Sequence, residues 1–196
     1  MLFRSLAFLI DLARSVDAEV RVIGMRLVVS RGGGGTALGL AWAGSLRRFE
    51  VLADLAHQRT AIVASGWDVD ARAGLSHRAD LSAIQAELGS DQAGADILQS
   101  KLGKRVDTLA HACPATAAEA RQLAEACYRQ AARGFVTGEG VCETDPRLQV
   151  GVPLQLSGLG PLFDGRYRTT AVSHLYDAEE GSRSSFRCNR VGLGRP

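Results

Sequence analysis

The sequence predicts an α+β protein in which barrel-like sheets of mostly antiparallel strands are accompanied by a few helices. Short apolar runs separated by glycines recur along the chain, which has 22 glycines among its 196 residues. This spacing is typical of antiparallel strands joined by turns. Two helical repeats of apolar residues, at 3–16 and 116–133, each precede a series of such runs. We therefore expect two sheet-centred regions, 1–110 and 111–196.

The first region opens with a helix over 3–16 and a hairpin. Leu6, Leu9, Ile10 and Ala13 recur at helical spacing. Two short strands follow at 19–22 and 26–30, and Gly24 supplies the turn between them. The apolar run at the start is interrupted too early for a signal peptide. No stretch approaches 18 apolar residues, so we expect no membrane insertion by this chain.

The rest of the first region reads as strands followed by weaker helical signals. We expect strands at 38–42, 48–56 and 58–68, a loop over 70–80, helices at 81–88 and 91–102, and a strand at 105–110.

The second region begins with the clearest element, a helix over 116–133. Thr116 stands three residues before Glu119, which is a capping box, and Gly134 is placed to end the helix. We expect its small-residue face, which includes Ala120, Ala124 and Tyr128, to pack against the strands that follow. These strands are expected at 135–143, 153–157, 167–177 and 184–191, with an Asp-Gly hairpin signal at 164–165.

Composition and charge narrow the classes of function. Hydrophobic residues make up 46% of the chain and charged residues 22%, so the sequence predicts a folded domain. The formal net charge is only +2. Specific nucleic-acid binding is therefore not expected, because phosphate binding needs clustered excess cations. The local pairs Arg47–Arg48 and Arg166/Arg168 lack the interleaved aromatic residues of a stacking platform.

Candidate catalytic residues are scattered, and we predict no catalytic site and no enzyme. The four histidines fit no known nucleophile or metal motif. His174 has Ser173 beside it, but neighbouring residues of a strand face opposite sides, so the two cannot form a nucleophile–base pair. A hydrogen-bonded structural His174 is the preferred interpretation. A small hydrolase centred on His174 and a nucleic-acid-binding β-barrel stay open as alternatives.

No cofactor or metal site is expected either. The cysteines at 113, 127, 142 and 188 form no C-x-x-C pair, and we interpret them as small buried thiols, with a disulfide left open. The glycine run in 32–37 follows a strand but opens no helix, so it predicts a loop rather than a dinucleotide site. Asp68 and Asp70 are interpreted as part of a turn.

An ordered series of segments resembles the phage late control D and VgrG-type hub family. The series comprises 5–14, 40–49, Val63-Ala-Ser-Gly-Trp-Asp68, 131–140, 156–160, Phe163-Asp-Gly-Arg-Tyr167 with the strand to His174, and 185–190. It covers nearly the whole chain but only about the C-terminal half of a family member, in which another barrel comes first.

The resemblance implies a structural role. Members of this family are baseplate hubs of contractile tails and injection machines. They form trimers of barrel-like domains that continue the tail tube and seat the spike. We therefore expect a homotrimer with spike, tube or baseplate proteins as partners, assembled in the cytoplasm and carried in a virion tail or injection particle.

Overall fold

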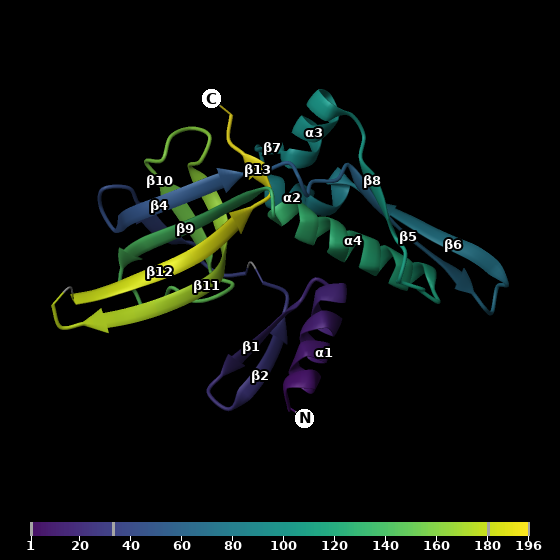
Figure 1. Ribbon diagram of the computed structural model, residues 1–196, viewed down its shortest axis with the longest axis horizontal. Helices are drawn as coiled ribbons and strands as arrows, with labels where there is room; N and C mark the ends of the chain where they lie inside the picture. Colours follow the sequence, from purple (N-terminus) through teal and green to yellow (C-terminus); the bar gives the residue numbers. More distant parts are fainter. Residues whose placement is uncertain (1, 33, 180, 196) are drawn as a thin grey trace. The chain divides into compact units, whose positions relative to one another are not determined.

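The computed structural model describes residues 2–32, 34–179 and 181–195. It confirms the α+β class, since helices accompany sheets whose strands are mostly antiparallel (Figure 1). None of the helices in these ranges is long and apolar enough to cross a membrane.

The chain divides into two compact units, and each unit is assembled from separate stretches of sequence. Unit 1 comprises 2–32, 58–87 and 95–132, and unit 2 comprises 34–57, 88–94 and 133–195. The sequence predicts consecutive regions instead, 1–110 and 111–196. The interleaving arises because strands from the first half of the chain pair with strands from the second half.

Unit 1 holds most of the helices. It contains, wholly or for most of their length, α1 (Leu2–Ser15), β1 (Glu19–Ile23), β2 (Arg26–Ser30), β5 (Ala61–Asp68), β6 (Ala73–Ala79), a 3₁₀ turn (Leu81–Ile84), α2 (Gln85–Leu88), α3 (Gly94–Leu102), β8 (Val106–Leu109) and α4 (Ala117–Arg133).

The three-stranded sheet of unit 1 has the order β6-β5-β8, with β5 antiparallel to β6 and parallel to β8. The expected loop over 70–80 is thus largely a strand. Strand β6 is not predicted because it lies at the edge of the sheet and its residues are mostly exposed. Its sequence therefore lacks the alternation of apolar and polar residues that indicates a strand.

Helix α4 begins as its capping box predicts. The Thr116 hydroxyl oxygen accepts the Glu119 N–H at 3.2 Å, and the Glu119 carboxylate accepts the N–H of Ala115 at 2.9 Å. Ala120, Ala124 and Tyr128 are buried on one face. The helix groups with the three-stranded sheet, whereas the sequence predicts that it packs against the C-terminal strands.

Enlarging a side chain on this face is expected to destabilise the protein. Ala124 has no exposed surface, so Ala124→Leu forces extra methylene groups into a filled site. The free energy of unfolding should fall by about 1–3 kcal/mol in urea titrations. Ala118→Leu is the matched control, because Ala118 is exposed on the same helix. Equal stability of the two variants would contradict the burial of this face.

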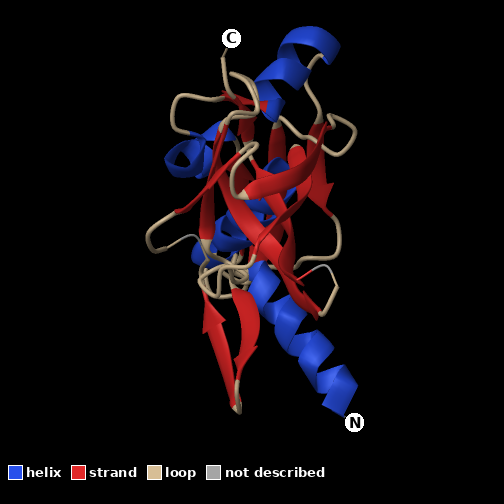
Figure 2. Cartoon of the chain, turned by 90° about the vertical axis from the view of Figure 1, so that its left-hand side faces the viewer, coloured by secondary structure: helices blue, strands red, loops and turns tan. Residues whose placement is uncertain are grey.

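The N-terminal hairpin is formed by β1 and β2, joined by a tight turn at Gly24 (Figure 2). Gly24 has φ of +59°, a conformation that glycine adopts without steric strain. Contacts link the end of α1 to α4 within unit 1: the Gln130 amide donates to the carbonyl of Arg14 at 2.6 Å.

Unit 2 is built around a six-stranded sheet of order β3-β10-β11-β12-β9-β4. All neighbours are antiparallel except β3 and β10. The elements are β3 (Leu38–Ala41), β4 (Leu46–Ala53), β7 (Gln92–Ala93), β9 (Val136–Glu143), β10 (Pro153–Ser157), β11 (Gly165–Asp177), β12 (Gly181–Arg190) and β13 (Gly192–Leu193).

This sheet must curl towards a barrel. Its two edge strands, β3 and β4, are consecutive in sequence and are joined by residues 42–45 alone. Four residues span at most about 14 Å, so the two edges come close together at this end. The connection is held on both sides: Trp42 donates to Ser157 of β10 at 2.9 Å, and Glu143 of β9 donates to Ser45 at 3.0 Å.

The interior of the curled sheet is filled by aromatic rings that lie over two glycines. Phe49 stacks on Phe186 with ring centroids 6.4 Å apart. A β-carbon on Gly138 would lie 2.5 Å from Cζ of Phe49, and one on Gly140 would lie 2.5 Å from Cζ of Phe186. The glycines of β9 therefore create the space that the two rings occupy.

Adding one methyl group to β9 is expected to disturb this packing. Gly140→Ala places a β-carbon inside the contact distance of Phe186 and should lower the unfolding free energy by about 1–3 kcal/mol. Gly39→Ala in β3 is the control, since nothing lies within 4 Å of its β-carbon position. Thermal melts that shift by the same amount for both variants would contradict the packing described.

Candidate functional site

His174 of β11 lies beside Ser184 of β12, its direct cross-strand partner. The Nδ1 atom of His174 is 2.7 Å from Oγ of Ser184, and Nε2 is 3.2 Å from the carbonyl oxygen of Leu148. Because a carbonyl only accepts, Nε2 donates to Leu148 and Nδ1 accepts the Ser184 hydroxyl proton. The three groups have the order of a nucleophile, a base and an orienting acceptor.

Burial prevents this arrangement from acting as a hydrolytic site in the folded protein. Ser184 has 0% of its surface exposed, so a substrate carbonyl cannot approach its oxygen. The sequence suggests Ser173 as the neighbour of His174, whereas the hairpin brings Ser184, ten residues away, to its side. The geometry supports a structural His174 that ties β11 and β12 to the segment at Leu148.

Other predicted candidates also have structural partners. Oδ1 of Asp68 accepts the N–H groups of Asp70 and Ala71 at 3.0 and 2.9 Å, which closes the turn between β5 and β6. In the glycine run, residue 33 lies outside the described residues, and the described neighbours form a loop before β3. Across the described residues, no group of three or more His, Cys, Asp or Glu could hold a metal ion.

The four cysteines are free thiols in different surroundings. Burial raises the pKa of the Cys142 thiol to about 11 and that of Cys188 to about 12, so both stay protonated and unreactive at neutral pH. Cys127 is half-buried. Cys113 is exposed, which differs from the interpretation of all four as buried thiols.

Of the local arginine pairs, Arg47 and Arg48 have acidic partners. Arg48 forms an ion pair with Glu50, and Arg47 lies 3.5 Å from Glu143. Arg166 and Arg168 also take part in interactions. Because each cation already has a partner, these pairs give the nucleic-acid alternative no support.

A buried ion pair fixes one end of unit 2. Arg190, only 6% exposed, donates from Nη2 and Nε to Oδ2 of Asp91 at 2.5 and 2.9 Å. Its Nη1 donates to the carbonyl of Asp164 at 2.9 Å, and its guanidinium lies 5.4 Å from the ring centroid of Tyr167. Arg190 thus joins the end of β12 to two separate loops.

Removing the acidic partner should leave a buried charge. Asp91→Ala is expected to lower the unfolding free energy by about 3 kcal/mol, since the guanidinium then has no carboxylate beside it and keeps the Asp164 carbonyl and Tyr167 as neighbours. Glu50→Ala, which removes an exposed partner of Arg48, should leave the urea midpoint nearly unchanged. Similar midpoints for the two variants would contradict a structural role for the Arg190 pair.

The outer face of the curled sheet carries two shallow hollows. One, of about 420 Å³, includes Arg48, Ser173 and Ser185 in its lining, and the other, of about 510 Å³, includes Leu52 and Asn189. Both share Glu50, Glu139 and Arg187. Arg187 and Glu139 form an exposed ion pair at 2.7 Å. Mixed charges on a broad strand surface are typical of a polar protein contact rather than of a pocket for a small ligand.

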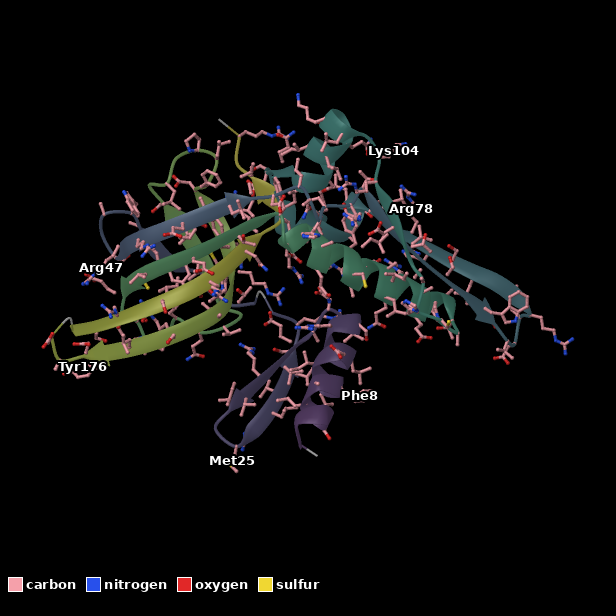
Figure 3. The ribbon with its side chains drawn as sticks, in the orientation of Figure 1. Phe8, Met25, Arg47, Arg78, Lys104 and Tyr176 are labelled. Atoms are coloured by element: carbon pink, nitrogen blue, oxygen red, sulfur yellow. The ribbon has the colours of Figure 1, made fainter. Side chains whose placement is uncertain are left out.

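Exposed apolar side chains gather at the turns of the hairpins. Trp67 and Val69 mark the turn between β5 and β6, and Leu175 and Tyr176 mark the end of β11. Figure 3 shows Tyr176 at that turn and Met25 at the tip of the N-terminal hairpin.

The family model of the Alg8 N-terminal domain, Alg8_N, matches residues 29–177, and the chain belongs to this family. The matching family is thus not the late control D and VgrG-type family that the sequence segments resemble. No curated protein sequence matches the chain.

Several solved structures share the fold. The tail protein from Neisseria meningitidis has a TM-score of 0.59 and 14% identity over 95% of this chain. The 43 kDa tail protein of prophage MuSo2 from Shewanella oneidensis has a TM-score of 0.64 and 13% identity over 93%. A chain of the native gene transfer agent virion has a TM-score of 0.57 and 15% identity over 92%.

The chain spans only part of these proteins. It covers 54% of the Neisseria tail protein, 53% of the prophage protein and 37% of the virion chain. At such low identity the likeness establishes the fold alone.

Proposed function

We propose that the chain is a structural component of a phage tail or a related contractile injection particle. Within it, the chain is a baseplate hub element that extends the tail tube and seats the spike. The observation that carries this proposal is the fold shared over 92–95% of the chain with two tail proteins and a virion chain.

The surface of the chain supports an assembly role. Its hairpins end in exposed apolar side chains such as Met25, Trp67 and Tyr176, and the outer sheet face of unit 2 presents paired charges. The buried Ser184 argues against a hydrolase. We therefore propose a non-enzymatic homotrimer whose partners are the spike and the tail tube or baseplate proteins.

The segment series from 131 to 190 supports the hub part of the proposal. In the structure these segments supply most of the curled sheet of unit 2, from β9 to β12. The proposed place of action is the particle, after assembly in the cytoplasm.

Co-expression with candidate spike and tail-tube proteins tests the proposal. We expect a stable complex by size-exclusion chromatography and native mass spectrometry. Tyr176→Ser removes an exposed apolar tip and should weaken the complex, whereas Ala118→Ser at an exposed helix site should not. Binding to neither protein, with esterase activity that disappears in His174→Ala, would contradict the hub function and favour the hydrolase.

A further inference from the structure

We draw no further inference here: the strongest candidate, the exposed apolar surface patch formed by α1 and the β1–β2 hairpin, carries none, because nothing in the structure shows what covers it.

Discussion

The close approach of two phenylalanine rings to two glycines is the packing constraint on which unit 2 depends. Phe49 from β4 and Phe186 from β12 both lie against β9, the strand between them. With Gly138 and Gly140 at the inward positions, the rings can approach the backbone, and the three strands bend around them. A side chain on either glycine would push a ring outwards and open the curvature that allows the 42–45 connection to join the two edges.

A filled interior determines where function resides in this protein. The inward positions of the sheet hold aromatic and aliphatic side chains, His174 is bound on both ring nitrogens, and Arg190 is held by Asp91. Buried polar groups with satisfied hydrogen bonds stabilise one arrangement of strands. The chemistry that remains available for partners lies on the outside, in the hollows of the outer sheet face and the apolar turns.

Local signals in the sequence predicted most elements, and the limits of the prediction have physical causes. The start of α4 could be predicted because the capping box of Thr116 and Glu119 involves residues only three positions apart. The strand at 153–157 is also found as predicted. The order of the strands in the sheet could not be predicted in this way, because β4 pairs with β9, which is far from it in the sequence. The link between Ser184 and His174 was missed for a related reason: strand alternation was read along one strand and not across the hairpin. Gly138 and Gly140 are two positions apart in the sequence, so both face the same side of β9. Nothing in the neighbouring sequence indicates that Phe49 and Phe186 lie over them, because these rings come from other strands.

The N-terminal hairpin differs from the curled sheet in that most of its apolar side chains are exposed. Its two strands are short and carry Arg21 and Arg26, but they also expose Val22, Ile23, Leu27 and Val29. Such a surface in a free monomer promotes unspecific aggregation unless a partner covers it.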